Sequence, residues 1–224
     1  MLRKLLLAFA LVCSGAHASP TSTPQGKLPI RPSVEKTEAR YKELVARAKA
    51  GKAVNFRDLR LAWLYGPAMK DDPRTEKLPA LRKAMFENMQ QGGDVKVVLA
   101  RARDILDIVY VDLDAQKAQR QSCEALGDDA CAQAGRVVAL GLLKSVVEGR
   151  DGRSCATAWR VVSVDEEYFV LRMIDAEFKQ QRIVNEDGNL CDEMSVELDG
   201  EETKRYFEIS DVVEARARRM KLKK

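Results

Sequence analysis

Histidine is almost absent from this chain of 224 residues, since it occurs once, at His17. The N-terminus predicts a secretory signal peptide over residues 1–18, because Arg3 and Lys4 precede a short apolar run and small residues lead to a cleavage point after Ala18. Cleavage there removes His17. A mature chain without histidine excludes histidine-based acid–base catalysis, Ser-His and Cys-His nucleophilic pairs, and histidine-containing metal sites.

Long hydrophobic runs are lacking as well. The apolar run at residues 5–12 is too short to cross a bilayer, which disfavours a transmembrane anchor. A lipoprotein anchor on Cys13 is the rival interpretation, but the bulky Leu11 and Val12 stand where such a site needs small residues. We therefore expect a periplasmic or secreted protein.

The cysteines lack the C-x-x-C spacing that is typical of a four-thiolate zinc site, so no metal or cofactor is predicted. Cleavage of the signal peptide leaves four cysteines, an even number in a chain bound for an oxidising compartment. Three connectivities are possible. We favour Cys123 with Cys131, which would staple a helix-turn-helix, and Cys155 with Cys191, which would join two strands.

Neither sign of charge dominates the sequence, which contains 38 basic and 34 acidic residues. The basic excess gathers at one end: residues 211–224 carry six basic and two acidic side chains. A basic end rather than a basic face argues against a nucleic-acid-binding protein. We expect this tail to be frayed and solvated, with contact to an anionic membrane surface as the alternative.

The region from 33 to 148 has the pattern of successive helices, after a proline-containing leader at residues 19–32 that we expect to be flexible. Ser33, Asn55, Asp94 and Asp128 each stand where a helix needs an N-cap, and four helices are expected between residues 81 and 148. The Gly-Asp turns that end in Asp94 and Asp128 lie 34 residues apart, the period of tetratricopeptide-type helix pairs. Apolar pairs such as Leu106 and Leu140 recur at that offset. We therefore predict tetratricopeptide-like α-hairpins.

The helical pattern stops within residues 149–168, and a strand-rich region extends over residues 149–210. Strands are expected at 157–162, 178–185, 194–198 and 203–209, with Asp-Gly turns at 187–188 and 199–200 that are typical of hairpins. A helix at 165–174 is inserted after the first strand. The predicted fold is therefore α+β, with a small antiparallel sheet of about four strands that covers the apolar end of the helical stack.

The acidic cluster Asp165, Glu166 and Glu167 is the most conspicuous chemical feature. Paired carboxylates can act as acid and base or hold a metal ion. Ser163 followed by Glu166 is, however, a capping box, and acids are favoured in a first helical turn. We favour this structural interpretation, and the candidate ligand or partner site that it leaves open consists of Asp165, Glu167, Tyr168, Arg153 and Arg60.

Residues 149–154 form a second candidate, because Arg150 and Arg153 flank glycines and the backbone amides of such a loop can cradle an anion. The loop follows a helix rather than opening one, and it lacks the lysine of a phosphate loop. A helix C-cap and a turn are the favoured explanation.

The sequence resembles a family of secreted bacterial proteins classed as a domain of unknown function, DUF4919. The resemblance rests on NFRDLRLAW at residues 55–63, on GRDGRSCATAWRVVSVDEEY at residues 149–168, on Gln181, and on Tyr206-Phe207. Cys191 departs from the family, which tends to have an aromatic residue there, and this suggests that the disulfides are particular to one branch. The resemblance implies a shared fold and an exported location, and it implies no activity.

Three functions follow as hypotheses. The leading one is an exported non-catalytic protein of the bacterial envelope that binds a protein or peptide partner through its helices. The second is an envelope hydrolase or ligand-binding enzyme that uses Asp165, Glu166 or Glu167 beside Arg153 or Arg60. The third, an inhibitor or immunity-type protein, differs from the first only in having one tight partner.

Overall fold

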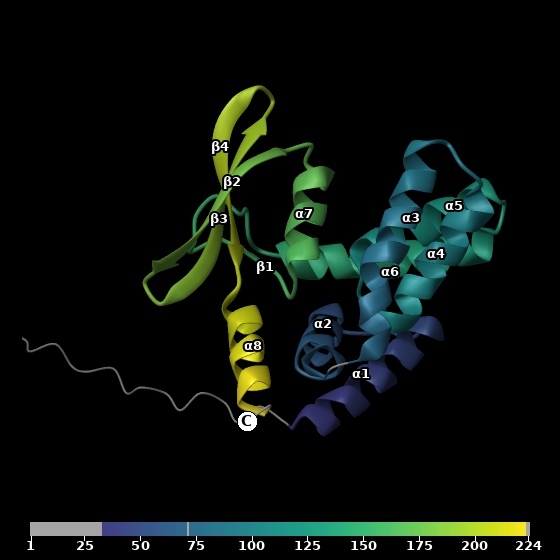
Figure 1. The fold of residues 1–224 in the computed structure, drawn as a ribbon, viewed down its shortest axis with the longest axis horizontal. Coiled ribbons are helices and arrows are strands. Elements are labelled where there is room, and N and C mark those ends of the chain that lie inside the picture. The colour runs from purple at the N-terminus through teal and green to yellow at the C-terminus, as the bar shows by residue number, and fades with distance from the viewer. Residues whose placement is uncertain (1–32, 71, 223–224) are drawn as a thin grey trace, which may run out of the picture. The chain divides into compact units, whose positions relative to one another are not determined.

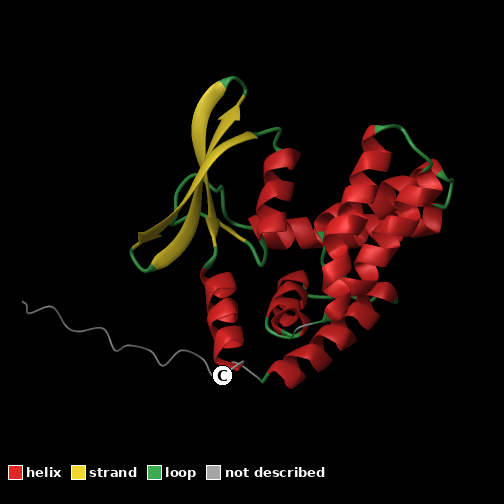
Figure 2. Cartoon of the chain, viewed as in Figure 1, coloured by secondary structure: helices red, strands yellow, loops and turns green. Residues whose placement is uncertain are grey.

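A run of helices followed by a sheet makes up the chain, as the computed structural model shows for residues 33–70 and 72–222 (Figures 1 and 2). The predicted signal peptide and leader lie outside the described residues. Ahead of the sheet come six α-helices and two short 3-10 helices: α1 Val34–Lys49, α2 Phe56–Leu64, η1 Pro67–Met69, η2 Pro73–Lys77, α3 Leu78–Gln90, α4 Val95–Ile108, α5 Leu113–Ala125 and α6 Asp129–Val147.

The helices begin where polar caps stand in the sequence. The side chains of Ser33, Asn55, Asp94 and Asp128 each accept a hydrogen bond from a backbone N–H of the first turn that follows. All four caps were predicted. Asp112 caps α5 in the same way, by accepting from the N–H of Ala115.

Helices α3 to α6 pack in sequence order, each against its neighbour. The predicted hairpins are therefore present, but their identity as tetratricopeptide-like repeats is not confirmed. The two members of one proposed repeat pair differ in environment: Leu106 is buried, whereas Leu140 on α6 is 59% exposed. The sequence period alone does not make these positions equivalent.

The sheet contains β1 Trp159–Arg160, β2 Glu177–Glu186, β3 Asn189–Leu198 and β4 Glu201–Glu208, in the spatial order β1-β4-β3-β2. Strands β2, β3 and β4 are antiparallel, and the turns at 187–188 and 199–200 have positive φ at both residues, as a tight hairpin requires. The short β1 pairs in parallel with β4. The sheet is therefore mixed rather than wholly antiparallel, because α7 Val164–Met173 carries the chain from β1 back to the far edge at β2.

One hydrophobic core joins the helical region to the sheet. Leu59, Met85 and Leu142 from the helices belong to the same buried cluster as Met194 and Phe207 from the sheet. The sheet region covers the helical stack only in part, because Val137 and Leu140 on α6 are 55% and 59% exposed. By length and composition α6 would suffice for a membrane span, but it packs against α5 and α2.

The basic tail is a helix through Leu222, which corrects the prediction of a frayed end. Helix α8, Ser210–Leu222, packs against η1 and β3 and buries Val212 and Ala215. The hydroxyl of Tyr65 on the α2–η1 connection donates to the Asp211 carboxylate at 2.7 Å. Val212 and Ala215 therefore serve docking within the chain, whereas Val213, Met220 and Leu222 of the same segment are exposed.

Both predicted disulfides are formed. Cys123–Cys131 closes the turn between α5 and α6, and Cys155–Cys191 ties the segment before β1 to the start of β3. The two disulfides fit an extracellular or periplasmic protein.

Candidate functional site

The three adjacent acids on α7 separate into three environments. Asp165 is exposed and pairs with Arg82 of α3 at 2.9 Å. Glu166 and Glu167 are both buried, but they face different partners. As expected for successive residues of a helix, the carboxylates do not converge on one point.

Arg60 of α2 is the partner of Glu166, and the two form a buried ion pair. The guanidinium binds both carboxylate oxygens, with 2.8 Å between Nε and Oε1, and it also donates to the carbonyl oxygens of Ser145 and Arg160. The N–H of Val162 donates to the same carboxylate. The predicted capping box is thus half formed: Ser163 accepts from the N–H of Glu166, while the Glu166 side chain binds Arg60 and the N–H of Val162 instead. Through Arg60, the ion pair joins α7 to α2, α6 and β1.

Glu167 has no such cation. It lies against Asp192 of β3, and Oε2 of Glu167 and Oδ1 of Asp192 have no hydrogen-bond partner within the described chain. Burial, and then the charge of Asp192, raise the pKa of Glu167 to about 9, while Arg216 of α8 acts weakly in the opposite direction. Only 1% of Glu167 is exposed, so a substrate has no access to this carboxyl.

Glu193 follows Asp192 on β3 and points to the other face of the sheet. There its carboxylate has cations as neighbours and not another acid. Arg182, Lys204 and the Tyr206 hydroxyl all donate to its carboxylate. The hydrogen bond from Arg182 is the main reason why its pKa falls to about 2. The negative charge of Glu193 is therefore balanced by two cations and stabilised by one hydroxyl donor.

The remaining predicted site residues lie apart from these acids. Tyr168 packs edge-on against Phe178 of β2. Arg153 is exposed in the turn at residues 149–154, where Asp151 accepts from the backbone N–H of Arg153 and from the Thr157 hydroxyl. The geometry is that of the favoured C-cap and turn. The structure therefore does not gather Asp165, Glu167, Tyr168, Arg153 and Arg60 into one site.

A groove in the helical region was missed by sequence reasoning. It consists of two adjoining hollows that share Lys49, Leu106, Asp107 and Tyr110. The first, of about 570 Å³, lies between α1, the η1–η2 segment and the end of α4. Its apolar residues include Val45, Pro67, Pro73 and Ile108.

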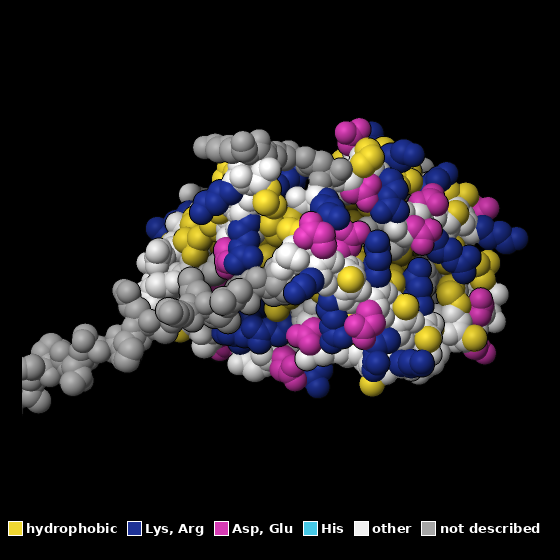
Figure 3. Space-filling model, turned by 90° about the horizontal axis from the view of Figure 1, so that it is seen from below, with side chains coloured by type: hydrophobic (Ala, Val, Ile, Leu, Met, Phe, Trp, Pro, Cys, Tyr) yellow, Lys and Arg dark blue, Asp and Glu magenta, His cyan; other side chains and the backbone are white. Residues whose placement is uncertain are grey.

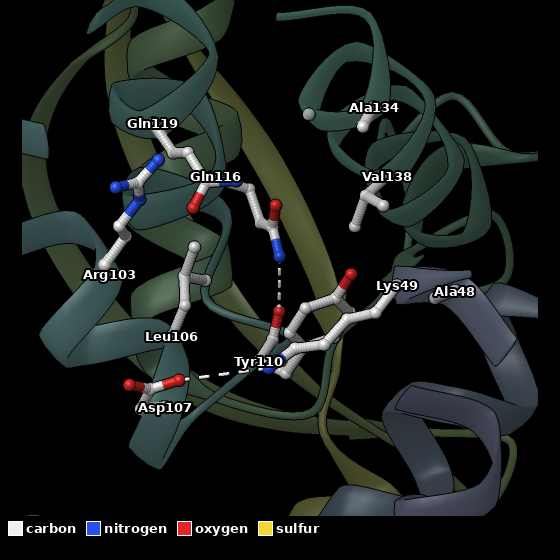
Figure 4. Close-up of a pocket in the computed structure, with 11 residues that line it drawn as sticks. Ala48, Lys49, Arg103, Leu106, Asp107, Tyr110, Gln116, Gln119, Ala134 and Val138 are labelled. Atoms are coloured by element: carbon white, nitrogen blue, oxygen red, sulfur yellow. Dashed lines mark hydrogen bonds and ion pairs between the residues drawn. The ribbon is translucent and has the colours of Figure 1, made fainter. Parts of the chain in front are cut away.

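The second hollow, of about 320 Å³, lies between α1, α4, α5 and α6. Figure 4 shows Arg103, Gln116 and Gln119 along one side of this hollow, with Ala134 and Val138 of α6 across from them. The Gln116 amide donates to the carbonyl of Tyr110 at 2.8 Å, which fixes it in place.

The boundary between the hollows is a loose ion pair. Lys49 Nζ lies 3.8 Å from Asp107 Oδ1 and 5.5 Å from the centre of the Tyr110 ring. Both charged side chains are more than half exposed, so water competes for each of them. A ligand group can replace either partner at small cost.

Cations outnumber acids in the groove. The five cations are Lys42, Lys49, Lys70, Arg74 and Arg103, and the three acids are Glu38, Asp72 and Asp107. Arg103 has no ion-pair partner among the described residues, in contrast to Arg101 two residues earlier, which binds Asp104 at 2.8 Å. On the face of the molecule seen in Figure 3, basic and acidic side chains are interspersed.

The groove left no signal in the sequence that local reasoning can detect. Lys49 and Asp107 end two helices that are 58 positions apart in the chain (107 minus 49), and their meeting depends on tertiary packing. The small residues Ala134 and Gly135 of α6 line the second hollow, but Gly135 also packs closely against Arg120 of α5, so small residues at these positions do not by themselves indicate a groove.

Metal ligation has a single cluster to consider among the described residues, formed by Cys123, Asp128 and Cys131. Both sulfurs are joined in a disulfide and the Asp128 side chain caps α6. A metal at this place would require reduction of the disulfide, so we do not assign one.

The chain is an α+β protein in which the helical stack contains the groove and the mixed sheet covers one part of that stack. The chain matches the family model described as Domain of unknown function (DUF4919) over residues 30–218, and it belongs to that family. No curated protein and no solved structure matches it.

Proposed function

We propose that the protein is an exported, non-catalytic binding protein whose helical groove takes an acidic peptide segment of a partner protein. The observation that carries this proposal is the groove itself, with apolar walls and an excess of cations. Carboxylates of the partner would replace Asp107 beside Lys49 and would meet Arg103, which has no ion-pair partner among the described residues, while aliphatic side chains would contact Leu106 and Val138.

Export is part of the proposal. The basic and apolar start of the sequence supports a signal peptide that is cleaved after Ala18, and the two disulfides support an oxidising compartment such as the periplasm. An inhibitor-type protein is the tight-binding form of the same proposal. The hydrolase hypothesis receives no support, because the carboxyl with the strongly raised pKa is closed to solvent.

Peptide binding by the full mature protein tests this function. The probe is a short fluorescein-labelled peptide that alternates leucine with glutamate, measured by fluorescence anisotropy at about 0.1 M salt so that exposed charges are partly screened. We expect saturable binding, and we expect Arg103→Glu to weaken it by about tenfold or more, as loss of ~1.4 kcal/mol implies.

The matched control is Arg101→Glu, which makes the same charge change on the same helix but outside both hollows. It should leave the affinity within about twofold, as expected for a charge that the ligand does not contact. Absence of binding, or equal losses in the two variants, would contradict the proposal. A peptide with glutamine in place of glutamate separates charge recognition from apolar contact.

A further inference from the structure

Two carboxyl groups are buried against each other where α7, β3 and α8 meet, and neither the groove nor its ligand involves them. Glu167 is 1% exposed and Asp192 is 4% exposed. One oxygen of each lacks a hydrogen-bond partner within the described residues. Buried polar atoms without partners are rare in folded proteins, and each one needs a physical explanation.

Two negative charges at this place would be costly. Burial removes the water that stabilises a carboxylate, and each charge would raise the energy of the other. Proton sharing resolves both problems, since a protonated Glu167 can donate a hydrogen bond to Asp192 and leaves one charge in the interior.

The surrounding charges do not neutralise the pair. Arg216 of α8 is the cation that acts on Glu167, and its effect is smaller than those of burial and of Asp192. Other charged groups of these elements have partners elsewhere. They are Asp165 with Arg82, Glu166 with Arg60, Arg172 with Asp114, Lys117 over the Phe169 ring, Glu193 with Arg182 on the other face of β3, and, on α8, Asp211 with the Tyr65 hydroxyl and Glu214 with Arg218.

The pair lies where the last helix is attached to the sheet. The N–H of Ile209 donates to the carbonyl of Leu190, and the N–H of Leu190 donates to the Ser210 hydroxyl at the start of α8. Leu190 is two residues from Asp192 on β3. A change in the charge of the pair therefore acts directly on the contact between β3, α7 and α8.

We propose that Glu167 and Asp192 hold one proton between them and make the α7–β3–α8 junction pH-sensitive, so that loss of this proton loosens the junction. The proton passes from the carboxyl group to solvent hydroxide, and two carboxylates are left facing each other. Separation of α7 from β3 and α8 then relieves their repulsion and admits water.

The sign of the effect follows from proton linkage. Between the ordinary pKa of 4.5 and the folded value of about 9, folded Glu167 holds a proton that the unfolded chain has released. The contribution of this group to stability is therefore complete below pH ~4.5 and is lost as the pH rises through this window. The equilibrium constant for unfolding should rise about tenfold per pH unit from this group alone.

Urea unfolding of the oxidised full chain, from pH ~5 to ~9.5, compares the wild type with Glu167→Gln. The unfolding constant of the wild type divided by that of Glu167→Gln reports the effect of the Glu167 proton alone. We expect this ratio to rise by about tenfold per pH unit across most of the range between the unfolded and the folded pKa. Glu193→Gln is the control, because its carboxyl titrates near pH 2 and its profile should run parallel to that of the wild type.

Asp192→Asn provides a second variant if Glu167→Gln does not fold. Removal of this charge lowers the pKa of Glu167, so the pH dependence should move to lower pH. Hydrogen exchange of the α8 amides near Ala215 should also accelerate with pH in the wild type by more than the intrinsic rise of the exchange rate with pH. Glu167→Gln should abolish this additional acceleration, and Asp192→Asn should move it to lower pH. Profiles parallel to the wild type in both variants, or α8 protection that does not respond to pH, would overturn the proposal.

Discussion

The groove and the α7 junction both contain charged side chains, but they use them in opposite ways. Lys49 and Asp107 in the groove are 55% and 74% exposed and lie 3.8 Å apart, whereas the side chains of Arg60 and Glu166 at the junction are 2% and 4% exposed. Exposed pairs contribute little to stability because water competes for them. The charges available to a partner are therefore those of the groove, and the charges of the junction hold the fold.

The junction repeats this contrast within two successive residues. The buried Glu166 carboxylate accepts hydrogen bonds from Arg60 and from the N–H of Val162, while the buried Glu167 carboxyl lies against another acid. Burial alone therefore does not determine the state of a carboxyl group. The partner that the fold places beside it does.

The largest expected effect comes from Arg60→Met, which would leave Glu166 charged and without its cation in the interior. We expect a loss of about 3–5 kcal/mol in the free energy of unfolding, the usual cost of breaking a buried ion pair. Urea denaturation followed by circular dichroism measures this loss. Arg57→Met on the exposed side of α2 is the matched control and should change stability by less than about 0.5 kcal/mol.

A double variant sharpens this test. Arg60→Met combined with Glu166→Met removes both charges, and it should recover much of the lost stability because apolar side chains of similar size can replace a buried pair. If Arg60→Met alone proved neutral, the statement that this buried ion pair holds the fold would be wrong.

The smallest expected effect comes from Lys49→Ala in the groove. Loss of an exposed, weakly paired lysine should change the free energy of unfolding by less than about 0.5 kcal/mol. Affinity for the acidic peptide should nevertheless fall, because the variant loses a cation that both hollows share. A stability loss comparable to that of Arg60→Met would remove the distinction between the two regions.

Local features of the fold could be predicted from the sequence. The caps Ser33, Asn55, Asp94 and Asp128 act on N–H groups two or three residues away, and the Asp-Gly turns are equally local. The disulfide pairing followed from cysteine spacing together with the expected elements. The caps and turns depend on neighbours in the chain, and sequence patterns record such neighbours directly. Cys155 and Cys191 are 36 positions apart, and their pairing was favoured because it joins two expected strands.

Features that depend on distant segments could not be predicted. Glu166 and Glu167 look alike in sequence, and only the approach of Arg60, 106 positions away, and of Asp192 on β3 makes them different. The parallel pairing of β1 with β4 and the docking of α8 have the same origin. The interpretation of the acids as helix-starting residues was correct for the Ser163 cap, but it did not anticipate a charge-bearing interior.

The protonation state of Glu167 tests the account most directly. Carbon-13 NMR of the glutamate side-chain carboxyl groups, with Glu167→Gln to assign the resonance, measures the pH at which this group ionises in the folded protein. The account predicts a midpoint near pH 9, whereas a midpoint near the ordinary value of 4.5 would contradict it.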